Sequence, residues 1–109
     1  MKRLVLILLV QMLVATFAFA GGNAAAGKEK SQVCVACHSE TGMSPTPTFP
    51  NIAGQYEDYL YMTLKTYKSG SRNNAIMSGI VAALSDQDMK DLAAYFASQK
   101  GLYGFGLPE

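Results

Sequence analysis

The chain has 109 residues, with nine lysines and arginines against eight aspartates and glutamates. This length allows one small domain. The formal net charge of +1 is too small to indicate binding to nucleic acid or to a highly charged substrate. The chain has only two cysteines and one histidine, so any metal or disulfide chemistry depends on few residues.

The first twenty residues have the organisation of a secretory signal peptide. Met1-Lys2-Arg3 is basic, residues 4–20 are apolar apart from Gln11 and Thr16, and the segment ends in Ala18-Phe19-Ala20. A basic head, an apolar run and an A-x-A ending predict export with cleavage near Ala20. An uncleaved membrane anchor remains the alternative, because this run is close to the shortest length that spans a bilayer. The periodicity of the chain assigns residues 21–101 to the folded domain and residues 102–109 to a flexible tail.

Helical patterns account for most of the mature chain. A first helix is expected over residues 23–37, with Asn23 as N-cap. Residues 39–54 form a loop containing Pro45, Pro47 and Pro50. Residues 55–69 form a helix that stops at Gly70. Its apolar stripe at i, i+3, i+4 and i+7 consists of Tyr56, Tyr59, Leu60, Thr63, Leu64 and Tyr67. Residues 75–84 are weakly helical, and a last helix runs from Ser85 to residue 100. No strand alternation occurs, so the fold class is all-α with about four short helices.

Both cysteines and the only histidine lie in one stretch, Cys34-Val35-Ala36-Cys37-His38. C-x-x-C-H is the attachment pattern of c-type haem. On a helix, side chains three and four residues after Cys34 lie on its face, so two thiols and an imidazole can approach one macrocycle. A redox dithiol normally lies in a βαβ context, which is missing here. A structural zinc site needs four ligands, and two cysteines with one histidine leave it one short. A disulfide between Cys34 and Cys37 would close a loop too short to stabilise the fold much.

A haem iron bound by His38 has a second axial position. No other histidine and no third cysteine exists, which leaves methionine, tyrosine, lysine or an open site. Met43 is too near His38 in sequence, Met89 lies on a core stripe, and Met62 lies within a regular helix. Met77 follows a polar loop that can bend towards the iron, so it is the preferred candidate. An ordinary packing role for Met77 is the alternative.

The sequence resembles the class I c-type cytochromes, especially the small bacterial periplasmic kind and single domains of the two-domain dihaem kind. The resemblance covers nearly the whole mature chain and is carried by residues 34–38, 49–55, 72–77, 84–86 and 92–96. It implies a cytochrome c fold around one covalent haem c, with thioethers to Cys34 and Cys37. It further implies axial ligation by His38 and Met77, a hydrogen bond from His38 to the Pro50 carbonyl, and Gly27 facing Tyr95 where the first and last helices cross.

With His and Met on both sides of the iron, no coordination site remains for a substrate. The expected function is therefore a periplasmic single-electron carrier and not an enzyme, and thioether ligation raises its potential. The expected partners are redox proteins, namely a membrane cytochrome complex and a terminal oxidase or reductase. No nucleic acid or small-molecule substrate is expected, and contact with the membrane is expected only through partners. One alternative is an electron-transfer subunit of an exported dehydrogenase or oxidase, docked through residues 102–109. The other is a haem enzyme or gas sensor in which Met77 does not ligate.

Overall fold

The structure is a computed structural model, and it describes residues 21–101. These residues form five helices: α2 (Ala24–Lys30), α3 (Gln32–His38), α4 (Glu57–Ser69), α5 (Ala75–Val81) and α6 (Asp86–Ala97). No strand occurs between residues 21 and 101, and the all-α fold class is confirmed. The expected signal peptide (1–20) and tail (102–109) lie outside the described residues. Within the described part of the chain, no helix is both long and apolar enough to cross a membrane.

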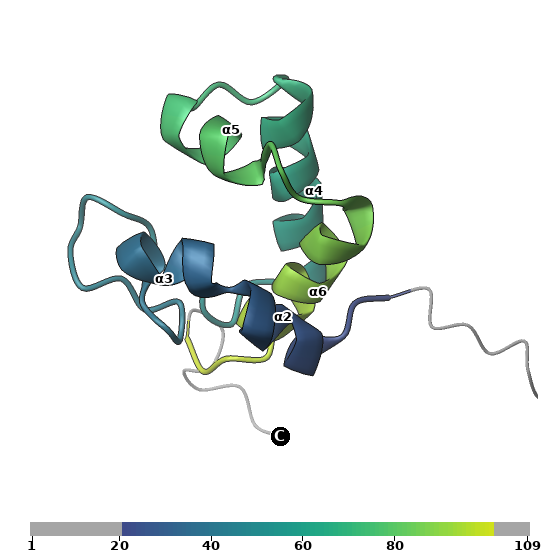
Figure 1. Ribbon diagram of the computed structural model, residues 1–109. Coiled ribbons are helices and arrows are strands. Elements are labelled where there is room, and N and C mark those ends of the chain that lie inside the picture. The colour runs from purple at the N-terminus through teal and green to yellow at the C-terminus, as the bar shows by residue number, and fades with distance from the viewer. Residues whose placement is uncertain (1–20, 102–109) are drawn as a thin grey trace, which may run out of the picture.

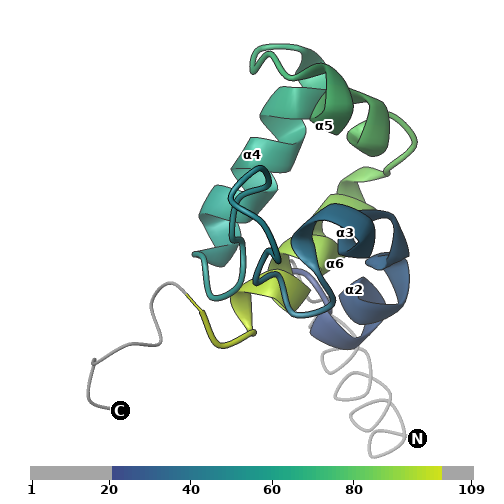
Figure 2. The ribbon, with the colours of Figure 1, turned by 90° about the vertical axis from the view of Figure 1, so that its left-hand side faces the viewer.

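The helices form two groups that face each other. Figure 1 shows α4 and α5 together at the top, and α2, α3 and α6 below them. α6 packs against both α2 and α4, so it joins the two groups. In Figure 2, turned by 90°, α2 and α3 lie over α6 while α4 rises beside them towards α5. The motif on α3 therefore faces the α4–α5 group from the opposite side.

The single first helix expected from the sequence is divided at Ser31, which is the one clear difference in the helices. Asn23 caps α2 as expected, with its side chain accepting the N–H of Ala26 at 3.0 Å. At the break, the Ser31 hydroxyl donates to the carbonyl of Lys28 at 2.7 Å. A serine that bonds to a preceding carbonyl competes with the regular helical bonds and favours a bend. The division turns α3 away from the axis of α2 and accounts for five helices where about four were expected.

Helices α2 and α6 cross at Gly27. A Cβ atom at this position would overlap the backbone carbonyl of Asp91 and lie 2.8 Å from Cβ of Tyr95. Glycine is therefore required by the close approach of the two backbones, and the expected neighbour Tyr95 is present. Asp91 is 3% exposed and accepts hydrogen bonds from the Asn23 N–H at 2.8 Å and from the Lys30 ammonium at 2.6 Å. The crossing thus combines a close contact between the two backbones with a buried carboxylate, that of Asp91, whose two oxygens both accept hydrogen bonds.

The long loop between α3 and α4 is fastened to α6 at two points. The Tyr95 hydroxyl donates to the carbonyl of Glu40 at 2.6 Å, and the N–H of Gly54 donates to the carbonyl of Phe96 at 2.9 Å. Between them, the carbonyl of Gly42 accepts the N–H groups of Ile52 and Ala53. These bonds hold the proline-containing segment in one place next to His38. The loop is consequently part of the wall that surrounds the candidate site.

Candidate functional site

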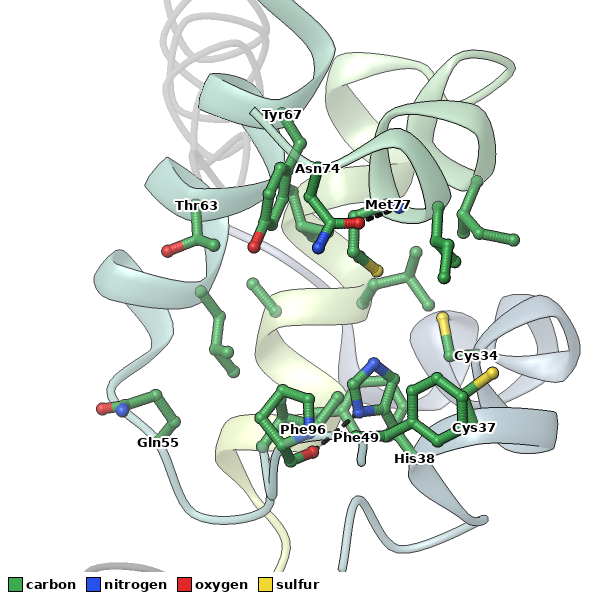
Figure 3. Close-up of a pocket in the computed structure, with 18 of the residues that line it drawn as sticks. Cys34, Cys37, His38, Phe49, Gln55, Thr63, Tyr67, Asn74, Met77 and Phe96 are labelled. Atoms are coloured by element: carbon green, nitrogen blue, oxygen red, sulfur yellow. Dashed lines mark hydrogen bonds between the residues drawn. The ribbon is translucent and has the colours of Figure 1, made fainter. Parts of the chain in front are cut away.

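A cavity of about 430 Å³ separates the two groups of helices. Its walls come from α3, the following loop, α4, α5 with the segment that leads into it, and α6 (Figure 3). Most lining side chains are apolar, among them Leu60, Leu64, Ile80, Leu92 and Phe96. The apolar stripe predicted for α4 therefore borders this space and does not fill a solid core. This explains why Tyr59, a member of the stripe, is 43% exposed.

His38 lies in the lower wall and is 7% exposed. Its Nδ1 is 2.8 Å from the carbonyl oxygen of Pro50. A carbonyl can only accept, so this contact favours the tautomer with the proton on Nδ1 and leaves the Nε2 lone pair free to ligate. The ring of Phe49 stands edge-on at a centroid distance of 6.5 Å. The loop thus favours one tautomer and holds the orientation of the imidazole, as expected of a metal-ligating histidine.

Cys34 and Cys37 lie one helical turn apart on α3 and are both free and half-buried. Burial raises the pKa of the Cys34 thiol to about 11, and the neighbouring Cys37 adds to the effect. Catalytic redox cysteines have lowered pKa values, so this environment does not suit a reactive dithiol. No group of three or more His, Cys, Asp and Glu side chains between residues 21 and 101 is arranged to hold a metal ion, so structural zinc lacks a ligand set there.

Met77 comes from the upper wall. Figure 3 shows its sulfur pointing into the cavity from the side opposite His38, with both cysteines at one edge. Asn74 caps the start of α5 by accepting the Met77 N–H at 3.0 Å, which fixes the backbone at this residue. The alternatives weighed from the sequence lie elsewhere, since Met43 and Met62 are exposed and Met89 is buried in α6. Met77 is the only methionine among the described residues that line the cavity.

The wall formed by α4 contains polar residues that sequence reasoning did not assign to the site. Tyr59, Thr63 and Tyr67 lie along the cavity side of this helix, and Arg72 follows it. The guanidinium of Arg72 lies 5.0 Å from the ring centroid of Tyr67. The signals in the sequence were a threonine within an otherwise apolar stripe and an arginine five residues before Met77. Neither signal identifies a cavity wall until the helices are placed.

These features fit a haem. The space is largely apolar, a histidine and a methionine face each other across it, and the two thiols lie at one edge. The sulfur and nitrogen donors are also those that hold haem iron in electron-transfer proteins. The fold and the site together define a haem-binding protein of the cytochrome c class.

Comparison with known proteins shows the family directly. The cytochrome c family model matches residues 24–100, and the chain belongs to this family. Cytochrome c4 of Pseudomonas aeruginosa (strain PAO1) is 46% identical over 108 residues, covering 99% of this chain and 54% of the relative. The crystal structure of reduced recombinant cytochrome c4 from Pseudomonas stutzeri superimposes with a TM-score of 0.71 at 48% identity, over 74% of this chain and 47% of that chain.

A further relative is the thiosulfate dehydrogenase electron acceptor of Thiomonas intermedia (strain K12). It is 38% identical over 95 residues, which cover 86% of this chain and 44% of the relative. The chain thus spans about half the length of these two relatives.

Proposed function

We propose that this chain is a single-electron carrier that holds one covalently attached haem c. In this proposal Cys34 and Cys37 would attach the haem through thioethers, and His38 and Met77 would bind its iron. The haem supplies a reversible one-electron change at its iron. The observation that carries the proposal is the placement of His38 and Met77 on opposite walls of an apolar cavity, with both thiols at one edge.

The chain's own residues act by holding the coordination fixed. The Pro50 carbonyl orients His38, and the Asn74 cap holds the backbone of Met77. The apolar lining from α4, α5 and α6 excludes water, which favours the less charged ferrous state. A protein ligand on each side leaves no position for a substrate, and this supports a carrier in preference to a haem enzyme.

The opening of the cavity supplies a place for redox partners to dock. Val33 and Ile76 line the cavity and are nevertheless 51% and 61% exposed. Small apolar rims of this kind suit brief contacts with a protein that donates or accepts an electron. The relative described as a thiosulfate dehydrogenase electron acceptor supports redox enzymes as the class of partner. We further propose that residues 1–20 direct export to the periplasm, with cleavage near Ala20.

The proposal is tested on the protein purified from the native or a haem-maturing bacterial host. Mass spectrometry of the intact chain is expected to show the mass of the chain from residue 21 plus one haem, bound to the peptide that contains Cys34 and Cys37. The ferrous protein is expected not to bind carbon monoxide. Ready binding of carbon monoxide would instead support the enzyme or sensor alternative. Stable co-purification with a dehydrogenase would support the dedicated-subunit alternative.

A further inference from the structure

The carbonyl that accepts a hydrogen bond from His38 belongs to the peptide unit between Pro50 and Asn51. Its oxygen lies 2.8 Å from Nδ1 of the imidazole (Figure 3). The direction of this oxygen follows from how the residues at the two ends of the peptide unit are held. At one end, the pyrrolidine ring restricts φ of Pro50 to about −65°. At the other end, the orientation depends on Asn51.

Asn51 is held by its side chain and by the residue that follows it. Its side-chain oxygen Oδ1 accepts the N–H of Ser44 at 2.6 Å. The next N–H along the chain, that of Ile52, donates to the carbonyl of Gly42 at 2.8 Å. Both bonds run to the opposite side of the same loop. The backbone of Asn51, and with it the peptide unit that carries the Pro50 carbonyl, is therefore fixed against the start of the loop.

The N–H of Ser44 shares a peptide unit with the carbonyl of Met43. This carbonyl accepts the hydroxyl of Ser39 at 2.7 Å. One peptide unit is thus bonded at its oxygen by the residue directly after His38, and at its N–H by the residue directly after Pro50. Hydrogen bonds in series polarise and strengthen one another. We call this connection the Ser39–Asn51 bridge.

The Ser39–Asn51 bridge and the bond from His38 to Pro50 form a closed ring. The bridge runs from the C-terminal end of α3 across the loop to Asn51, and the Pro50 carbonyl returns to the imidazole on α3. In a closed ring, the distance between imidazole and carbonyl changes only when another member shifts. The hydroxyl of Ser39 also offsets part of the strain of its backbone, whose φ is 66°.

We infer that Ser39 and Asn51 are positioning residues that hold the Pro50 carbonyl against His38 and thereby lower the reduction potential of the bound iron. This inference rests on the proposed function. A hydrogen bond from Nδ1–H to a carbonyl places more negative charge on the imidazole and makes it a more basic ligand. A more basic ligand favours ferric over ferrous iron. Breaking the bridge loosens the carbonyl, so it is expected to weaken this bond and to raise the potential.

The test compares haem-loaded Asn51→Ala and Thr46→Ala with the wild-type haem protein. Thr46 is a matched control because it is exposed on the same loop, does not line the cavity, and uses only backbone atoms in its hydrogen bonds to described residues. For Asn51→Ala we expect the ferric-to-ferrous ratio at a fixed potential to fall about threefold, which raises the midpoint by about 28 mV for one electron. Thr46→Ala is expected to keep the wild-type midpoint.

A second measurement reports on the hydrogen bond itself. Exchange of the His38 Nδ1 proton with solvent, followed by NMR in the ferrous protein, is expected to accelerate about tenfold in Asn51→Ala and to stay at the wild-type rate in Thr46→Ala. Asn51→Asp keeps an oxygen acceptor for the Ser44 N–H and is expected to exchange slowly, like the wild type. Exchange in Asn51→Asp as fast as in Asn51→Ala would overturn the inference.

Ser39→Ala separates the bridge from the cavity wall. Asn51 lines the cavity, whereas Ser39 does not. Alanine and serine carry the same backbone strain at this position, so Ser39→Ala removes only the hydroxyl that bonds to Met43. We expect it to raise the midpoint and to accelerate the exchange of the His38 Nδ1 proton, as Asn51→Ala does. If Asn51→Ala does not incorporate haem, Ser39→Ala provides the comparison with Thr46→Ala.

Failure of this inference is distinguishable from failure of the proposed function. A wild-type protein without covalent haem, or with an open sixth position, would contradict the proposed function. A wild-type protein with the expected haem, in which Ser39→Ala has the midpoint or the exchange rate of Thr46→Ala, would overturn only the Ser39–Asn51 bridge. This holds even if Asn51→Ala shifts the midpoint, because Asn51 would then act directly at the cavity wall.

Discussion

Met77 faces His38 from the opposite wall of the cavity, with its sulfur directed into the space that separates them (Figure 3). The two residues belong to α5 and α3, helices that are far apart in the chain and belong to different groups of the fold. Their opposition depends on α6, which packs against both α2 and α4 and so sets the distance between the two groups. The site is therefore a product of the whole fold and not of the C-x-x-C-H motif alone.

Replacing Met77 is the first test of this opposition. In Met77→Ala, loss of the methionine sulfur is expected to lower the midpoint potential by more than about 59 mV, which corresponds to a tenfold change in the ferric-to-ferrous ratio. The ferrous variant is also expected to bind carbon monoxide. Met62→Ala is the matched control, because Met62 is 54% exposed on α4 and does not line the cavity. Equal midpoint potentials and equal carbon monoxide binding in the two variants would show that Met77 does not bind the iron.

Replacing two helical glycines by alanine is expected to change the free energy of unfolding in opposite directions, because Gly27 lies at the crossing of α2 and α6 and Gly79 does not. Gly27→Ala would push a methyl group into the backbone of Asp91, and we expect it to lower the free energy of unfolding by about 1–3 kcal/mol. Gly79→Ala, on α5, has open space around its Cβ position and is expected to raise this free energy by about 0.5–1 kcal/mol. Chemical denaturation of both haem-loaded variants measures the pair. A stabilised Gly27→Ala protein would contradict the close crossing.

Asp91 predicts a pH dependence of stability. Burial alone raises the pKa of this carboxyl, but hydrogen bonds from Lys30, Asn23 and Gln87 outweigh it and hold the pKa below its usual value. The stability from Asp91 is therefore present above the unfolded-state pKa of about 3.9 and is lost as the pH falls through the lower folded-state value.

In Asp91→Asn, this part of the acid-induced loss of stability is expected to disappear, as measured by denaturation at several acidic pH values. The control is Asp86→Asn. The pKa of Asp86 is also lowered, chiefly by the Tyr61 hydroxyl and Lys90, but its side chain is exposed and screened by solvent. A similar change of slope in both variants would show that the buried network has no special role.

The backbone at Ser39, directly after His38, predicts that glycine is tolerated better than alanine at this position. Its φ of 66° and ψ of 171° belong to a region occupied essentially by glycine alone. We expect Ser39→Gly to be more stable than Ser39→Ala by about 1 kcal/mol, since only glycine relieves the strain and both variants lose the hydrogen bond from Ser39 Oγ to the Met43 carbonyl. Thermal melts of the two haem-loaded variants provide the comparison. Equal melting temperatures would mean that the backbone is relaxed at this position.

Local signals in the sequence predicted much of the fold. Asn23 caps α2, Gly70 ends α4 with a φ of 83°, and Ser85 with Asp88 forms a capping box at the start of α6. Each of these features depends on residues within one turn, so it can be read from the chain without tertiary information. The break at Ser31 was missed because a mid-helix serine usually points to solvent, and only the fold shows that its hydroxyl bonds to the Lys28 carbonyl.

The candidate site was predictable where its residues adjoin in sequence and not where the fold brings them together. Cys34, Cys37 and His38 lie within five consecutive residues, and the hydrogen bond between His38 and Pro50 was expected from the family resemblance. Arg72 and Thr63 were not foreseen, because their closeness to the cavity depends on how α4 faces α3. The exposure of Tyr59 was missed for the same reason: a helical stripe shows which residues share a face but not whether that face meets protein or a cavity.

The central claim is that His38 and Met77 bind the haem iron from opposite sides. It is tested most directly by the near-infrared absorption spectrum of the oxidised wild-type protein. Ligation by a methionine sulfur gives ferric haem a weak charge-transfer band in this region. The account predicts that the purified protein shows this band and that Met77→Ala lacks it, while Met62→Ala retains it. A ferric wild-type protein without the band would contradict the claim.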